Sequence, residues 1–81
     1  MNVRVRLGAG LARQAGTSQL SVDLDDGATI GDLLTNLEHS YPSLAGGFDR
    51  ALTVVSGNHV SASERLEEGK DVALLFPTAG G

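Results

Sequence analysis

The chain opens with two segments in which apolar side chains stand at every second position. Residues 2–7 and 19–24 both show this alternation, which is typical of strands that bury one face. Gly8, Gly10 and Gly16 punctuate the segment between them and favour a loop or turn there. The two strands are therefore expected to form a hairpin with a long, glycine-bearing connection.

A helical period replaces this alternation after the second strand. Thr29 is a predicted helix N-cap, and Asp32 supplies a capping-box partner with a negative charge in the first turn. The apolar positions that follow form one stripe of an amphipathic helix: Ile30, Leu33, Leu34, Leu37 and Tyr41. Because Pro42 disfavours helical geometry at the residue before it, the helix should end at about Ser40. Residues 43–50, which include two adjacent glycines, predict a loop.

Further strands are predicted in the second half of the chain. Residues 51–56 and 71–76 are apolar on both faces, as expected of strands inside a sheet. A turn at residues 57–58 leads to a short return strand at 59–60, and residues 66–69 form a turn with one apolar anchor. The order of elements predicts an α+β fold, in which a mixed sheet curls around one main helix.

One helix covers only one face of a sheet, so we expect the other face to be open to solvent. Val72 and Leu74 should point to the helix, which leaves Ala73 and Leu75 pointing outward.

On the neighbouring strand the outward pair is either Thr53 and Val55 or Leu52 and Val54. Aliphatic side chains on an uncovered face predict a docking surface, and scattered surface hydrophobic residues are the alternative.

Composition and charge narrow the range of functions. The 81 residues suit a single domain, and the lack of cysteine excludes disulfides, zinc-thiolate sites and thiol chemistry. Six basic and ten acidic residues give a net charge of −4, which argues against nucleic acid and an anionic membrane as partners. No apolar run reaches the roughly 20 residues that span a bilayer. The alternating start with its two arginines does not fit a signal peptide, so we expect a cytoplasmic protein.

The candidate metal and catalytic side chains favour no known site. His39 and His59 lack a metal-binding spacing, and the acidic residues at 23, 25 and 26 lack the pattern of a calcium loop. Glycines 8 and 10 are too few for a dinucleotide fingerprint. We therefore expect no bound metal or cofactor, and a protein that is not itself an enzyme.

The C-terminal segment is the exception. Gly80 and Gly81 follow an apolar strand and Pro77, so we expect residues 76–81 to form an extended, flexible tail. Neither glycine carries a Cβ, which would let the backbone enter a narrow channel. Gly81 would also present an unhindered carboxylate. A frayed terminus without function is the alternative.

Four segments, in order, resemble a known family. Residues 5–22 resemble the opening hairpin of the small sulfur carriers of the MoaD/ThiS type, which have the ubiquitin-like β-grasp fold. Residues 29–42 resemble their central helix, 66–72 their Leu-x-x-Gly-Asp-x-Val turn, and 74–81 their Gly-Gly ending.

The chain also departs from the family pattern in two places. The family often carries an aromatic residue where Gly8 stands. It also carries two prolines before the tail, of which only Pro77 is present, with Phe76 in the other place. These departures bear on which member of the family the chain is.

The resemblance implies a defined chemistry for the tail. An E1-like adenylating enzyme of the MoeB/ThiF type would use ATP to adenylate Gly81, and a persulfide donor would convert the product to a thiocarboxylate. Gly80 and Gly81 would thread the activating site. The approach to it would be lined by five residues: Leu75, Phe76, Pro77, Thr78 and Ala79. The open sheet face would dock on the activating enzyme, and the net negative charge would suit a basic groove.

The resemblance leaves several functions open. The first is the small subunit of molybdopterin synthase, assembled with a larger catalytic subunit that accepts the sulfur. The second is a sulfur carrier for cysteine, thiamin or thio-natural-product biosynthesis. A ubiquitin-like modifier joined to target lysines through Gly81, or a plain interaction module, would fit the same sequence.

Overall fold

The computed structural model describes residues 1–44, 48 and 51–76. Its strands are β1 (Asn2–Leu7), β2 (Gln19–Asp23), β3 (Leu52–Val55), β4 (Asn58–His59) and β5 (Asp71–Leu75). Its helices are α1 (Ala9–Ala15), α2 (Ile30–Ser40) and the short 3-10 helix η1 (Pro42–Leu44). The predicted loop at residues 43–50 thus begins inside η1, and its two adjacent glycines lie outside the described residues.

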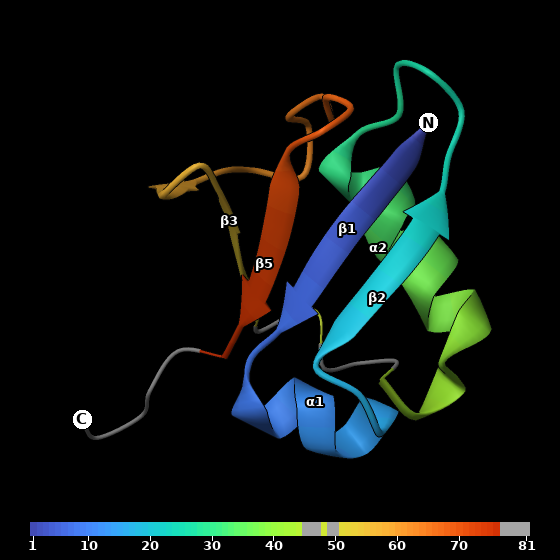
Figure 1. Ribbon diagram of the computed structural model, residues 1–81, viewed down its shortest axis with the longest axis vertical. Helices are drawn as coiled ribbons and strands as arrows, with labels where there is room; N and C mark the ends of the chain where they lie inside the picture. The colour runs from blue at the N-terminus through green and yellow to red at the C-terminus, as the bar shows by residue number, and fades with distance from the viewer. Residues whose placement is uncertain (45–47, 49–50, 77–81) are drawn as a thin grey trace.

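The strands form one mixed sheet in the order β2-β1-β5-β3-β4 (Figure 1). The β1–β5 pair is parallel, whereas the β1–β2, β3–β5 and β3–β4 pairs are antiparallel. Val5 pairs with both Leu20 and Val72, so the apolar side chains of three strands share one face. The ubiquitin-like β-grasp fold predicted from the sequence is confirmed.

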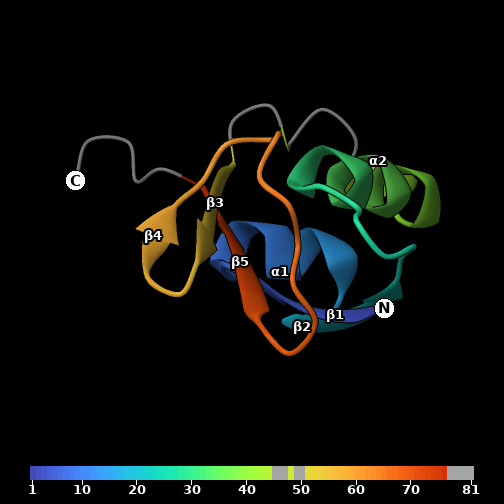
Figure 2. The same ribbon diagram turned by 90° about the horizontal axis from the view of Figure 1, so that it is seen from above.

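Helix α2 covers the apolar face of this sheet, as Figure 2 shows from above. Its capping box is present: the Asp32 backbone N–H donates to Thr29 Oγ1 at 3.3 Å, and the Thr29 N–H donates to Asp32 Oδ2 at 2.9 Å. Ile30, Leu33 and Leu37 are buried. The helix ends at Ser40, so its start, its stripe and its end are all as predicted.

The segment between the first two strands is a helix, and the prediction of a loop there is wrong. Helix α1 starts after Gly8 without a side-chain cap, and it ends at Gly16, which adopts a left-handed φ of 80°. The Gly16 N–H donates to the Ala12 carbonyl oxygen at 2.8 Å. Gly8 and Gly16 thus mark the two ends of the helix. Leu11 is fully buried and anchors the helix to the core.

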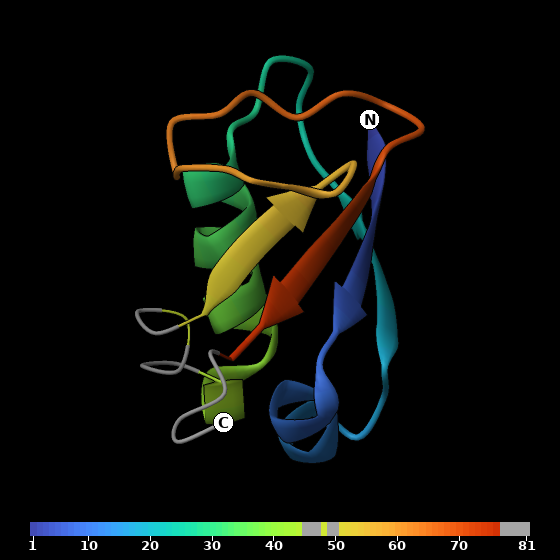
Figure 3. The ribbon, with the colours of Figure 1, turned by 90° about the vertical axis from the view of Figure 1, so that its left-hand side faces the viewer.

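The parallel strands β1 and β5 end at the same edge of the sheet, and helix α1 lies at that edge (Figure 1). It contacts β1, β5 and η1. The side view in Figure 3 places α1 below the strands and α2 across one face of the sheet. Within the described ranges, neither helix has the length and apolar character needed to cross a bilayer.

Candidate functional site

The face of the sheet opposite α2 carries an apolar patch. The strand register places Val54 beside Ala73 and Leu52 beside Leu75, and we call these four residues the open-face patch. Leu52 is 37% exposed and Leu75 is 39% exposed. The prediction that Ala73 and Leu75 point outward is confirmed, with Ala73 half-buried.

The structure also decides between the two predicted outward pairs on β3. Thr53 is only 5% exposed and pairs with the fully buried Leu74, so it belongs to the inner face. The outward pair is therefore Leu52 and Val54, and the Thr53–Val55 alternative is wrong. Successive side chains of a strand point to opposite faces, so the inward position of Thr53 places Leu52 and Val54 on the outer face.

Basic side chains border the open-face patch on its β1 side. Arg6 pairs with Ala73 across the parallel ladder, and Arg4 pairs with Asp71, with Nε to Oδ1 at 3.2 Å. Both arginines are exposed. Because Asp71 offsets the charge of Arg4, a docking partner would meet an apolar centre with the Arg6 guanidinium beside it, although the whole chain has a net charge of −4. The net charge follows from the composition, whereas the local charge beside the patch follows from the pairing of β1 with β5.

Two of the residues predicted to line the approach to the activating site lie on different faces of the molecule. Leu75 lies in the open-face patch, whereas the next residue, Phe76, is half-buried and packs against the core. Pro77, Thr78, Ala79, Gly80 and Gly81 lie outside the described residues. The site that the structure places is therefore the end of β5, from which these residues continue.

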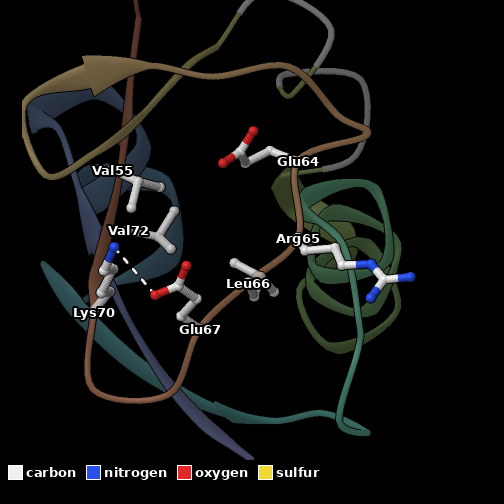
Figure 4. A pocket seen from close by; sticks show the side chains of 7 residues that line it. All are labelled: Val55, Glu64, Arg65, Leu66, Glu67, Lys70 and Val72. Atoms are coloured by element: carbon white, nitrogen blue, oxygen red, sulfur yellow. Dashed lines mark ion pairs between the residues drawn. The ribbon is translucent and has the colours of Figure 1, made fainter.

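A small hollow lies between β3, β5 and the turn that precedes β5. Figure 4 shows its lining, with Leu66 and Val72 at the base and the Lys70–Glu67 ion pair at 3.2 Å on its rim. Its volume of about 20 Å³ is enough for about one water molecule. The buried Leu66 confirms the predicted apolar anchor of this turn.

A wider depression lies elsewhere, beside the acidic turn after β2. It measures about 390 Å³ and is open to solvent, unlike the enclosed apolar clefts that bind metabolites. In residues 1–44, 48 and 51–76, no three histidine or acidic side chains come together as metal ligands. Neither hollow supplies convergent catalytic groups, so the end of β5 with the open-face patch is the candidate site.

Comparison with known proteins assigns the chain to a family. Residues 5–81 match the ThiS family. The chain belongs to the ThiS family. The match begins within β1 and continues through α1, β2, α2, the turn before β5 and the residues after β5. It covers all four segments that carry the resemblance seen in the sequence, and that resemblance is confirmed.

Two relatives of the chain carry different names. The chain is 31% identical to small archaeal modifier protein 1 of Haloferax volcanii, over 94% of this chain and 97% of that protein. It is 26% identical to the molybdopterin synthase sulfur carrier subunit of Chlamydomonas reinhardtii, over the full length of both. One is named a modifier and the other a sulfur carrier.

Solved structures agree on the fold. A crystal structure of the Haloferax volcanii modifier superposes with a TM-score of 0.90 at 29% identity, covering 100% of both chains. A chain from the complex of subunits 1 and 2 of the Helicobacter pylori molybdopterin-converting factor superposes at 0.73 with 18% identity, also over 100% of both chains. The same fold therefore assembles with a second subunit in that protein.

Proposed function

We propose that the chain is a sulfur carrier whose C-terminal carboxylate, on Gly81, is adenylated and then converted to a thiocarboxylate. The observation that carries this proposal is the match to the ThiS family through residue 81. It is supported by the place of the tail: residues 76–81 follow directly on β5, whose last residue, Leu75, lies in the open-face patch.

The proposed chemistry begins with activation, because a free carboxylate is a poor acyl electrophile. A carboxylate oxygen of Gly81 attacks the α-phosphorus of ATP on an E1-like enzyme of the MoeB/ThiF type. The bond to pyrophosphate breaks, and an acyl-adenylate forms. The outer sulfur of a persulfide then attacks the acyl carbon, and AMP leaves with the electron pair of the broken bond. A second thiol cleaves the resulting disulfide, which leaves the thiocarboxylate on Gly81.

The carrier itself contributes binding and presentation rather than catalysis. In the proposed complex Gly80 and Gly81 thread the activating site, since the absence of Cβ atoms leaves the backbone thin. Leu75 and the rest of the open-face patch dock beside that site. Arg6 at the basic border favours an acidic surface on the partner.

The first acceptor that we propose is the precursor of molybdopterin, held by the large subunit of a molybdopterin synthase. The full-length similarity to the Chlamydomonas reinhardtii carrier subunit supports this choice. Delivery to cysteine, thiamin or a thio-containing natural product uses the same thiocarboxylate and remains the alternative within the family.

Intact-mass measurement tests the thiocarboxylate directly. The purified chain is incubated with ATP, an E1-like enzyme of the MoeB/ThiF type and sodium sulfide as sulfur source. Attack of sulfur on the acyl-adenylate replaces one oxygen, so the mass rises by about 16 Da. A variant that lacks Gly81 should keep the circular dichroism spectrum and gain no mass. If the intact chain gains no mass with any activating enzyme, the proposal is wrong.

A second candidate is a protein modifier that is joined to lysines of its targets through Gly81. The 31% identity to small archaeal modifier protein 1 favours it. Its activation step is the same, but the lysine amine, in place of sulfur, attacks the activated carbonyl.

Proteolysis separates the two candidates. Lys70 is the last basic residue of the chain, so trypsin would leave residues 71–81 attached to any modified lysine. Peptides that carry the branch DVALLFPTAGG would show conjugation. A thiocarboxylated chain without such branches, in cells that make molybdopterin, favours the carrier.

A further inference from the structure

The start of helix α1 and the end of β5 are in unusually close contact. The Gly8 N–H donates to the Leu74 carbonyl oxygen at 2.9 Å. A Cβ added at Gly8 would lie 3.1 Å from Leu75 Cδ2, closer than side chains normally approach. The backbone of Gly8 thus lies directly against the last two residues of the strand.

The contact continues one residue beyond β5. A Cβ added at Gly10 would lie 2.9 Å from Phe76 Cδ2 and 3.3 Å from Cε2. The Phe76 ring therefore rests on the backbone of α1 at a position where a glycine leaves room for it. In a helix, glycine is less favourable than alanine by about 1 kcal/mol, so the room for the ring comes at some expense of helix stability.

These contacts join two positions that are far apart in the sequence. Gly8 precedes α1, and Phe76 follows β5. In the fold both belong to one small interface between α1 and the end of β5. Phe76, directly after β5, thus supplies the aromatic ring of this interface.

We propose that Gly10 and Phe76 form a seat that positions the tail for activation. The contact of the ring with Gly10 holds the chain at Phe76 against α1, next to the open-face patch, and so fixes the point where the tail begins. Activation needs the carboxylate at the nucleotide, and small misplacements of reacting groups have large effects on rate. Gly10 is a positioning residue that acts through the Phe76 ring. This inference rests on the proposed activation of Gly81.

Gly10→Ala tests the seat, because the new methyl group occupies the space of the ring. Alanine also raises helix propensity, which offsets part of the packing lost when the half-buried ring moves, so the variant should remain folded, as circular dichroism can check. We expect kcat/KM for adenylation by the E1-like enzyme to fall roughly tenfold or more. Gly31→Ala is the matched control, since Gly31 lies in α2 and the nearest atom to its added Cβ is 3.4 Å away.

A double-mutant cycle separates positioning from a general effect on the fold. Phe76→Ala should lower kcat/KM about as much as Gly10→Ala. If Gly10 acts through the ring, adding Gly10→Ala to Phe76→Ala should change nothing further. Multiplied losses, or a Gly10→Ala variant as active as the parent, would overturn the proposal.

An NMR measurement tests the seat without any activating enzyme. The free protein should show nuclear Overhauser effects between the Gly10 α-protons and the Phe76 ring. Gly10→Ala should shift the amide resonances of Thr78 and Ala79, whereas Gly31→Ala should not. Unmoved resonances would contradict the seat even if Gly81 is activated. Shifted resonances in a chain that is never activated would contradict only the proposed function.

Discussion

Helix α2 carries in its own sequence a cap, an apolar stripe and a stop, whereas α1 has a single buried leucine between glycines. In α2, Thr29 and Asp32 close the capping box, and three side chains of one stripe are buried. In α1, Gly8 provides no side-chain cap, and only Leu11 is buried. The first helix is therefore stabilised largely by what surrounds it, since a helix of 7 residues is too short to form alone.

The difference between the helices has a functional side. Helix α2 fills the inner face of the sheet and holds the fold, and it lies away from the end of β5. Helix α1 contacts Leu75 and Phe76 directly. Loss of packing in α2 should thus reduce stability, whereas loss of packing in α1 should also disturb the approach to the tail.

The largest effect is expected from Leu33→Ala in α2. Leu33 is 0% exposed, and removal of a fully buried leucine side chain destabilises by about 4 kcal/mol. That is a large share of the roughly 5–15 kcal/mol that holds a small domain together. Urea unfolding monitored by circular dichroism measures the loss. Leu34→Ala, a half-buried position on the same helix, should lose clearly less, and equal losses would contradict the comparison.

A smaller loss is expected from Leu11→Ala in α1, although Leu11 is also 0% exposed. We expect about 2–3 kcal/mol, because a short helix at the end of the sheet can open locally while the strands stay paired. Hydrogen exchange should show faster opening of α1 than of α2. At a temperature where the variant is fully folded, its thiocarboxylation should still be slower than that of the parent. A stability loss as large as that of Leu33→Ala would show that the two helices unfold as one unit.

The smallest of the three effects is expected from Thr29→Ala. The substitution removes the hydroxyl that accepts from the Asp32 N–H and should destabilise by about 1 kcal/mol. Thr29→Ser keeps the acceptor and should stay near the parent. Because α2 lies away from the end of β5, thiocarboxylation of the folded Thr29→Ala protein should be unchanged. A slower reaction in that variant would show that the tail also depends on α2.

Much of the fold was predictable because its signals are local. Alternation identified β1 and β2, and the capping box and Pro42 bounded α2 at both ends. The two strands that are apolar on both faces were correctly predicted as inner strands: β5 lies between β1 and β3. Helix α1 does not follow from the sequence pattern, because the glycines at its start are signals typical of a loop. The run Leu11–Ala15, which is rich in good helix formers and ends at Gly16, was the available clue.

The sequence places the candidate site at the C-terminal segment but leaves the geometry around it open. The Gly-Gly ending and the family resemblance both indicate that the tail is the functional segment. The choice between Thr53 and Leu52 as outward residues needed the strand register, because both faces of β3 are apolar. The strand register is also needed to place Arg6 at the border of the open-face patch. Arg6 and Ala73 are far apart in the sequence and become neighbours only in the parallel ladder.

By itself, the sequence determined the class of fold, the position and ends of the main helix, and the family, because periodicity, capping and ordered motifs are properties of neighbouring residues. Only the tertiary structure decided which side chains form the open-face patch and that α1 exists. It also decided that Gly10 lies under the Phe76 ring. These features depend on residues that are distant in the chain, and their contacts arise only when the sheet has closed around its core.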